Sequence, residues 1–424
     1  MNGKKAGTDI NLYKLFTEQC FNLLRSGGEC GIVIPSGIYT DLGTKQLREM
    51  LFSQTKVTGL FCLENRKIIF EEVDSRFKFV VLTFEKDSTT TEFPSAFMRL
   101  DLQELQMFPS EDSLQISVDM VRQLSPDSLS VMEFKNGVDI RIAEKMGKFP
   151  LLGEKIENKW NLVLCNEFHM TNDSNLFYIN QDAGRLPLFE GKMIHQFTHQ
   201  WGKPHYWIDE AEARKALSKK QGDTGQRLNY QKYRLAFREI ARNTDIRTVI
   251  TTLLPPNVFA NHKLFLSNLN NISLINYQEL LYTCGLLNSF VFDFMARQRV
   301  TTSISMFIVY QLPIPRLTKN DRYFNDIVQR AAKLICTTPE FDELAQEVGL
   351  GSHQQGVTDE TERATLRAEL DGMVAHLYGL TEDEFSYILT TFPIVNATLK
   401  EAALSAYRIF APMFADSEKL ALIQ

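Results

Sequence analysis

The sequence predicts an α/β domain at its N-terminal end, followed by an α+β domain and a helical C-terminal region. In residues 1–90, helical and strand-like hydrophobic spacings alternate. From residue 149 to 316, short aromatic and β-branched runs are separated by Pro, Gly and Asn, which is typical of an irregular β-containing domain with two helical stretches. After residue 316 the spacing is helical. At ~150 residues per domain, we expect segments 1–90, 91–148 (a connector), 149–316 and 317–424.

The N-terminal region has the pattern of a parallel sheet with covering helices. Leu12, Phe16, Cys20 and Leu23 share one helical face, and Gly27 and Gly28 separate them from an apolar run. The expected elements are a helix over residues 9–24, a buried strand over 30–35, a helix over 42–52, and strands over 57–63 and 76–85, the last pair antiparallel. The Gly-rich turn of nucleotide-binding sheets does not follow the first strand, so the pattern indicates half a sheet.

Further helices are expected near the domain boundaries and in the C-terminal region. They cover residues 138–146, 321–337, 358–378 and 381–391. Thr381 and Glu384 have the spacing of a capping box at the start of the last of these helices.

Composition excludes several classes of protein. No apolar run reaches the ~20 residues of a membrane helix, and the polar N-terminus is not a secretory signal. The 6 cysteines have no CxxC spacing, which argues against a disulfide framework and a zinc ribbon and favours a cytoplasmic location. We expect no membrane partner and no metal in this chain.

The net charge of -6 conceals an uneven distribution along the chain. Residues 185–247 hold 13 Lys/Arg and 7 Asp/Glu, a net of +6, whereas residues 321–424 hold 8 and 17, a net of -9. The basic middle segment is the candidate for binding a polyanion.

His195, His199 and His205 have the spacing of a three-histidine zinc protease site. That chemistry needs a carboxylate beside the first histidine to deprotonate the metal-bound water, and Gln196 occupies this position. The ligands must also lie one helical turn apart, whereas the surrounding sequence is aromatic and loop-like. The alternatives are polar contacts to a ligand by His195, Gln196, His199 and nearby Lys192, or a solvated aromatic loop.

Arginines form two groups in the same region. Arg234, Arg238 and Arg242 are spaced by four, so on one face they would meet successive phosphates, with Arg247 close by. The second group comprises Arg297, Arg299, Thr301 and Thr302, whose side chains all suit phosphate. The alternative for the first group is a solvated helical face paired with Glu239 and Asp245.

Phe70 precedes the predicted strand over 76–85. An aromatic ring at the mouth of a sheet can stack on a base flipped out of duplex DNA. The alternative is a core residue.

Together these residues resemble the adenine-specific DNA methyltransferases of bacterial restriction-modification and phage-defence systems, especially type IIG-like enzymes. The segments that carry the resemblance are 9–16 with 27–36, 64–86, 186–197, 237–248 and 312–315. The resemblance implies a partial Rossmann-like methyltransferase sheet, a target-recognition domain over 149–316 that binds double-stranded DNA, and Phe70 as the ring that stacks on the adenine. In that family S-adenosylmethionine donates the methyl group.

The sequence lacks the two motifs with which the family binds its cofactor and carries out its reaction. The family's Gly-containing cofactor loop and its Asn/Asp-Pro-Pro-Tyr/Phe catalytic loop do not occur, and Pro255-Pro256 lacks the flanking residues. We therefore expect no catalytic residue in this chain, no productive binding of S-adenosylmethionine by the chain alone, and a complementing chain that carries the N-terminal half of the methyltransferase domain.

The sequence supports two hypotheses of function. The first is the DNA-binding, sequence-recognising portion of an adenine-specific methyltransferase. The second is a non-catalytic specificity or regulatory subunit that holds a separate methyltransferase or nuclease through its acidic helical tail. A zinc-dependent hydrolase would require bound metal.

Overall fold

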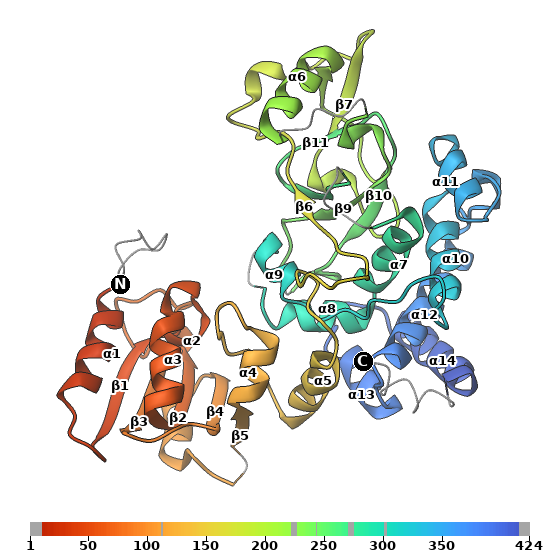
Figure 1. The fold of residues 1–424 in the computed structure, drawn as a ribbon. Coiled ribbons are helices and arrows are strands. Elements are labelled where there is room, and N and C mark those ends of the chain that lie inside the picture. The colour runs from red at the N-terminus through yellow and green to blue at the C-terminus, as the bar shows by residue number, and fades with distance from the viewer. Residues whose placement is uncertain are drawn as a thin grey trace. The chain divides into compact units, whose positions relative to one another are not determined.

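The computed structural model describes residues 11–111, 113–221, 227–242, 244–269, 275–300 and 303–414. The chain divides into two compact units, residues 1–148 and residues 149–424 (Figure 1). Each unit is described by itself. In the described ranges, no helix is long and apolar enough to cross a membrane.

The first unit is a mixed five-stranded sheet with helices. In chain order its elements are α1 (Leu12–Leu23), β1 (Glu29–Pro35), α2 (Gly37–Thr40), α3 (Lys45–Gln54), β2 (Thr55–Glu64), β3 (Lys78–Lys86), β4 (Glu92–Arg99), β5 (Leu114–Ser117), α4 (Val118–Leu124) and α5 (Gly137–Gly147). The strand order is β1-β3-β2-β4-β5. β3 runs antiparallel to both β1 and β2, which are therefore parallel to each other, and β4 is parallel to β2.

The expected helix-to-strand steps are present, but the expectation of a buried first strand was wrong. β3 is inserted between β1 and β2, which makes β1 an edge strand in the described sheet. Along β1 only Ile34 is buried, and Val33 is half exposed. The unbroken apolar sequence of this strand therefore does not reflect burial on both faces within this unit.

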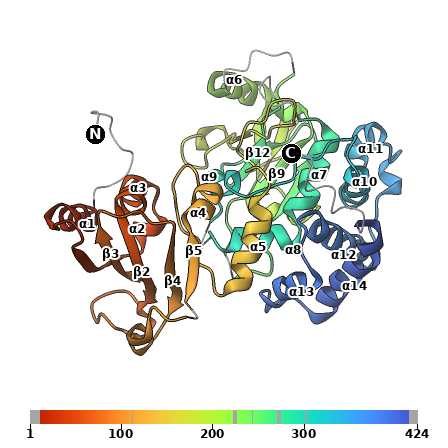
Figure 2. The ribbon, with the colours of Figure 1, turned by 60° about the horizontal axis from the view of Figure 1, so that its bottom comes forward.

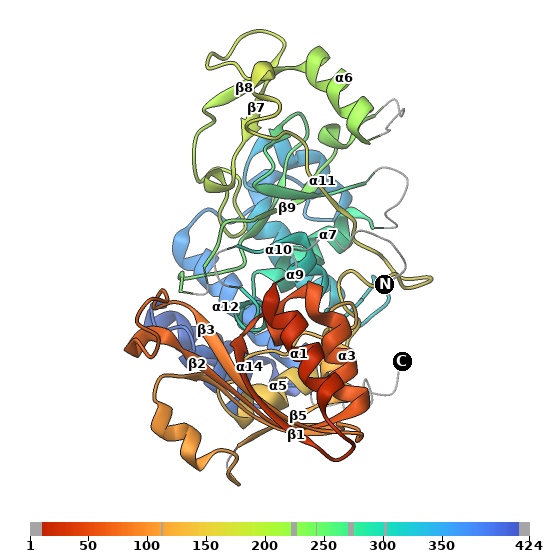
Figure 3. The same ribbon diagram turned by 90° about the vertical axis from the view of Figure 1, so that its left-hand side faces the viewer.

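Helix α1 also exposes the stripe that its sequence predicts to be buried. Leu12, Phe16 and Leu23 are 70%, 60% and 76% exposed, while the side chains of Tyr13 and Thr17 are buried. Figure 3 shows α1 and α3 beside the strands of this sheet. The helix thus packs on the unit through a mostly polar face and leaves its apolar face uncovered.

Residues 91–148, expected to connect two domains, contribute β4, β5, α4 and α5 to the first unit. Buried Arg48 of α3 donates hydrogen bonds to the carbonyl oxygens of Ile38 and Ser128. Glu133 accepts hydrogen bonds from the Tyr39 hydroxyl at 2.9 Å and from Lys78 Nζ at 2.5 Å. These polar contacts attach the end of this segment to the sheet and to the helices beside it.

The second unit combines two small sheets with a large set of helices (Figure 1). Its strands are β6 (Leu164–Cys165), β7 (Arg185–Phe189), β8 (Tyr206–Asp209), β9 (Arg234–Arg238), β10 (Thr251–Leu254), β11 (Phe259–Ala260) and β12 (Leu264–Ser267). Its helices are α6 (Glu210–Gln221), α7 (Tyr277–Leu287), α8 (Phe290–Arg297), α9 (Met306–Tyr310), α10 (Phe324–Ile335), α11 (Asp342–Glu347), α12 (Glu360–Leu377), α13 (Glu382–Thr390) and α14 (Ala397–Phe414). The sheets have the orders β10-β9-β12-β6 and β11-β7-β8.

The C-terminal helices follow the expected pattern with short shifts at their ends. α10, α12 and α13 match the three helices expected there, and Figure 2 shows α12, α13 and α14 grouped together in blue. The Thr381–Glu384 capping box is confirmed: Thr381 Oγ1 accepts from the Glu384 amide, and Glu384 accepts from the Thr381 amide at 2.8 Å. Helix α14 was not expected from the sequence.

A buried ion pair links the two small sheets of the second unit. Arg234 of β9 and Glu167 are both fully buried, with Nη1 and Oε1 2.6 Å apart. Arg234 Nη2 also donates to the Val258 carbonyl, and Glu167 Oε2 accepts from the Ala260 amide of β11 at 2.8 Å. Burial raises the pKa of Glu167, and Arg234 opposes this shift. Each charge of this buried pair is neutralised by the other.

Removal of one partner should therefore be costly. We expect Glu167→Ala to lower the free energy of unfolding by about 3–5 kcal/mol, because it leaves a buried guanidinium without its counter-ion. The matched control is Glu212→Ala on α6, an exposed carboxylate whose loss should change stability by less than about 0.5 kcal/mol. Urea unfolding measures both. Equal stability of the two variants would contradict the importance of the pair.

Candidate nucleic-acid interface

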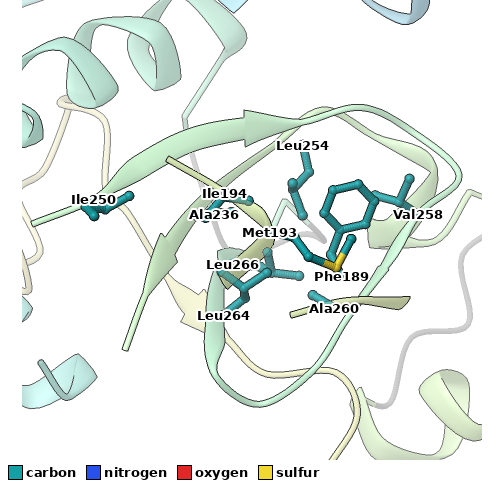
Figure 4. Packing of buried hydrophobic residues seen from close by; sticks show 10 residues of the cluster. All are labelled: Phe189, Met193, Ile194, Ala236, Ile250, Leu254, Val258, Ala260, Leu264 and Leu266. Atoms are coloured by element: carbon teal, nitrogen blue, oxygen red, sulfur yellow. The ribbon is translucent and has the colours of Figure 1, made fainter. Parts of the chain in front are cut away.

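A loop after β7 carries four of the predicted binding residues, and its first turn is anchored in the core. Met193 and Ile194 are fully buried in an apolar cluster with Ala236 of β9, Leu254 of β10 and Leu264 of β12 (Figure 4). Lys192 lies beside Met193 but is exposed, with Nζ 3.1 Å from Glu190 Oε2. The loop therefore has a fixed base and an exposed polar side.

Residues 195–198 form a tight turn and not a helix. The amide of His195 donates to the Thr198 carbonyl, and the amide of Thr198 donates back to the His195 carbonyl. Phe197 has φ of 60° and its ring is buried. The helix that the zinc motif requires is thus not present at this position. In the ranges that the structure describes, no group of three His, Cys, Asp or Glu side chains could hold a metal ion.

Two of the predicted contact residues in this loop face inward. Gln196 is buried and donates from Nε2 to the Asn288 carbonyl at 3.0 Å. His199 is buried between the rings of Phe189 and Phe341. Burial lowers the pKa of His199 to about 4, although Glu340 lies 3.9 Å away and acts in the opposite direction. Both side chains hold the loop against neighbouring elements.

His195 lies among positive charges. Its ring is half buried and packs on Trp201 with the ring centroids 4.4 Å apart and the ring planes inclined by 30°. Burial, together with the charges of Arg238, Arg367 and Arg247, lowers the pKa of His195 to about 4, and Glu360 acts in the opposite direction. His195 is consequently neutral at physiological pH and marks a region of positive potential.

Arg238 lies at the end of β9 in this region. Among the described residues no carboxylate lies within 4.0 Å of its guanidinium, and its buried Nε has no hydrogen-bond partner. Burial lowers the pKa of Arg238, with Asp245 opposing the shift, yet an arginine remains charged in proteins. A Cβ at Gly191 would lie 3.0 Å from Arg238 Cγ, so this glycine makes room for the arginine stem.

Helix α12 adds two arginines that the sequence analysis missed. Arg363 is buried and donates to the carbonyls of Leu334, Val357 and Phe197, which fixes α12 against the loop. Arg367 lies one turn further, near His195, and pairs with Glu360. Both residues belong to the acidic C-terminal region, so its net charge concealed them.

The predicted row of arginines does not share one face. Arg234 is 0% exposed and paired with Glu167, so it cannot reach a phosphate. Arg247 and Arg297 flank buried Asp293, with Nε atoms 3.3 and 3.6 Å from its carboxylate. We therefore assign these three arginines structural roles. Their carboxylate partners, and not solvent or phosphate, satisfy their charge.

The remaining predicted residues divide further. Arg242 is exposed, and its own backbone amide bonds to Asp245. Arg299 donates to Gln311 Oε1 at 2.7 Å, and burial lowers its pKa to about 10. Thr301 and Thr302 lie outside the described residues. The structure thus brings together Lys192, His195 and Arg238 with Arg367 and Trp201, and this group is called the cationic surface below.

Phe70 belongs to the first unit and lies on a structured loop between β2 and β3. The fully buried Asn65 donates from Nδ2 to the carbonyls of Phe70 and Val73 and accepts from the Phe70 amide. Phe70 is 43% exposed, and its ring meets Phe79 edge to face at 4.9 Å. Ile68 and Phe77 on the same loop are also exposed. The loop therefore presents an apolar surface at the end of the sheet.

The turn after β1 is closely packed. A Cβ at Gly37 would lie 2.5 Å from both Asp41 Oδ2 and the Tyr13 hydroxyl. The sequence also lacks the cofactor loop of the family that it resembles, so we assign no residue of this turn to S-adenosylmethionine.

Comparisons with known proteins give a match at the N-terminal end. Residues 1–70 match the sequence model of the family described as Eco57I restriction-modification methylase. A search of curated proteins finds no match.

Solved structures of restriction-modification enzymes are similar at low identity. For the type IIL enzyme MmeI, in complex with DNA, identity is 12% and the TM-score is 0.47, with 92% of this chain and 53% of that chain covered. For the type IIG restriction endonuclease BpuSI, identity is 14% and the TM-score is 0.33, with 95% of this chain and 49% of that chain covered. For the type ISP enzyme LlaGI, in complex with a DNA substrate mimic, identity is 13% and the TM-score is 0.41, with 76% of this chain and 30% of that chain covered. The chain spans about half of these proteins or less.

The buried histidine gives a pH-dependent stability. The pKa of His199 is about 4 in the folded chain and about 6.5 in an unfolded chain. Between these values the unfolded chain binds more protons, so the free energy of unfolding should fall as the pH falls from about 6.5 to 4. We expect His199→Phe, which keeps the aromatic packing, to reduce this slope in urea unfolding. The control is His205→Gln at an exposed position, which should leave the slope unchanged. A wild-type slope in His199→Phe would contradict the assignment.

Proposed function

We propose that this chain is the DNA-binding, sequence-recognising portion of an S-adenosylmethionine-dependent, adenine-specific DNA methyltransferase of a restriction-modification system. The observation that carries the proposal is the cationic surface, where Arg238 has no carboxylate partner among the described residues. A guanidinium kept charged without an internal counter-ion is suited to a phosphate. The family match over residues 1–70 supports the assignment to the methylase class.

Each unit would have its own task. The second unit binds the phosphate backbone of duplex DNA through Arg238, Arg367 and Lys192, and phosphate contacts fix the register in which base edges are read. In the first unit, Phe70 stacks on the adenine once it leaves the helix. The loops that bind the methyl donor and orient the adenine amino group come from another polypeptide segment. All six cysteines are free, which agrees with work in a reducing cytoplasm.

We also propose that a complementing methyltransferase segment covers α1 and β1. In α/β proteins, a helix that leads into a strand lies over the groove between that strand and a parallel neighbour. β1 has only the antiparallel β3 as a neighbour in the described sheet. A further parallel strand beside β1 would pair its open edge and cover Leu12 and Phe16. An exposed apolar edge is otherwise a site of aggregation.

The first test is DNA binding by fluorescence anisotropy with a labelled mixed-sequence duplex, over about 50 to 250 mM salt. We expect binding that weakens steeply with salt. Arg238→Ala should weaken it for all sequences and reduce the slope of log K against log salt by about 1. The control is Arg408→Ala, an exposed arginine of α14 that pairs with Glu382, which should retain the wild-type slope. No binding by the wild-type chain would count against the proposed function, and equal slopes would remove Arg238 from the interface.

The second test concerns the uncovered apolar stripe. We expect the isolated chain to self-associate in light scattering as its concentration rises, and to become monomeric when a chain with the missing cofactor and catalytic loops is co-expressed and co-purifies. Phe16→Glu should abolish both the self-association and the co-purification with the partner chain, because it places a charge in the contact. Leu399→Glu on α14, at a comparably exposed leucine, is the control. A monomeric wild-type chain that ignores its partner would refute the docking surface.

A further inference from the structure

Trp201 is the exposed tryptophan of the second unit. Its side chain is 63% exposed, whereas Trp160 is 1% exposed and Trp207 is partly buried. Removing an indole ring from water is one of the largest apolar gains available to a side chain. A tryptophan left in solvent on an otherwise well-packed unit is therefore a candidate contact for a ligand or partner.

The backbone holds Trp201 in a defined position. Its amide donates to the Met193 carbonyl at 3.0 Å, and the amide of Gly202 donates to the same oxygen at 3.2 Å. Met193 itself is fully buried in the apolar cluster. A Cβ at Gly202 would lie 3.2 Å from Met193 Cα, so the glycine permits this close approach. The ring is thus presented on a rigid base and loses little freedom when it binds.

The surroundings of the ring are positively charged. The indole packs on the His195 ring at an inclination of 30°, and the low pKa of about 4 keeps that imidazole neutral. Arg238 and Arg367 act on His195 with positive charge, and residues 191–205 contain Lys192 and Lys203 but no Asp or Glu. An aromatic ring beside cations is the combination that binds nucleic acid, where rings stack on bases and cations meet phosphates. Two of these cations also pair with carboxylates, Lys192 with Glu190 and Arg367 with Glu360.

We propose that Trp201 contacts DNA directly and stacks its free face on a nucleotide base, while Arg238 binds the adjacent backbone. This inference rests on the proposed function and adds a residue that reads the base and not the phosphate. A protein partner would be favoured by an apolar rim around the ring, whereas the charges that act on His195, the ring's neighbour, are those of Arg238, Arg367 and Arg247, with Glu360 opposing them. This excess of positive charge favours DNA.

Intrinsic fluorescence provides the direct test, because a stacked base quenches indole emission. With saturating duplex, we expect the emission of the wild-type chain to fall, and Trp201→Phe to abolish this change while the chain still binds in the anisotropy assay. The matched control is Trp207→Phe, which removes another tryptophan of the same unit and should leave the quenching intact. DNA-dependent quenching that persists in Trp201→Phe would overturn the inference.

Affinity separates the roles of the two residues. Trp201→Ala should weaken binding about 10-fold, within the range of one base–aromatic stack, with the salt slope unchanged because no charge is lost. Arg238→Ala should lower the slope. If Trp201→Ala binds as tightly as wild type while Arg238→Ala loses slope, the inference on Trp201 fails and the proposed function stands. If the wild-type chain binds no DNA and Trp201→Ala instead abolishes a self-association, the ring is a protein contact and both fail.

Discussion

The buried pair of Glu167 and Arg234 is the interaction on which the second unit depends. It joins β9 in one sheet to the Ala260 amide of β11 in the other. Arg234 and Arg238 are four residues apart on the same strand, and alternate residues of a strand point to the same side. The first guanidinium is neutralised inside, and the second emerges at the end of β9 with no described carboxylate beside it. One strand thus supplies both a buried, paired arginine and one that the proposed function assigns to phosphate binding, and the position of the second follows from the anchoring of the first.

The arginine row shows why spacing alone could not separate these roles. A spacing of four fits the period of a helix as well as that of a strand, and the sequence does not reveal which arginine has a buried acid beside it. Glu167 lies 67 residues before Arg234, and Asp293 comes from α8, far along the chain from Arg247. Such pairings are made by tertiary structure. The capping box at Thr381, whose partners are three residues apart, was by contrast fully predictable.

The cationic surface illustrates a second limit of sequence analysis. Lys192, His195 and Arg238 belong to the basic middle segment and were singled out there by the spacing of its histidines and arginines, whereas Arg367 lies in a segment with a net charge of -9. Helix α12 carries it to His195 because Arg363, one turn earlier, binds the Phe197 carbonyl. Trp201 was noticed only as part of an aromatic loop. Its exposure could not be deduced, because tryptophan is more often buried than exposed.

The first unit departs from expectation in a way that has physical meaning. The apolar spacing of α1 correctly predicts a helix, yet Leu12, Phe16 and Leu23 face solvent and Tyr13 and Thr17 face the unit. Three large apolar side chains of α1 are exposed, and the open edge strand β1 beside it has half-exposed residues of its own. Together they leave apolar area uncovered that a chain folding in isolation would bury. A periodic apolar stripe marks the face of a helix that packs against other structure, whether that structure belongs to the same chain or to another. The mismatch between the predicted and observed burial of α1 and β1 is the observation on which the proposed complementing segment rests.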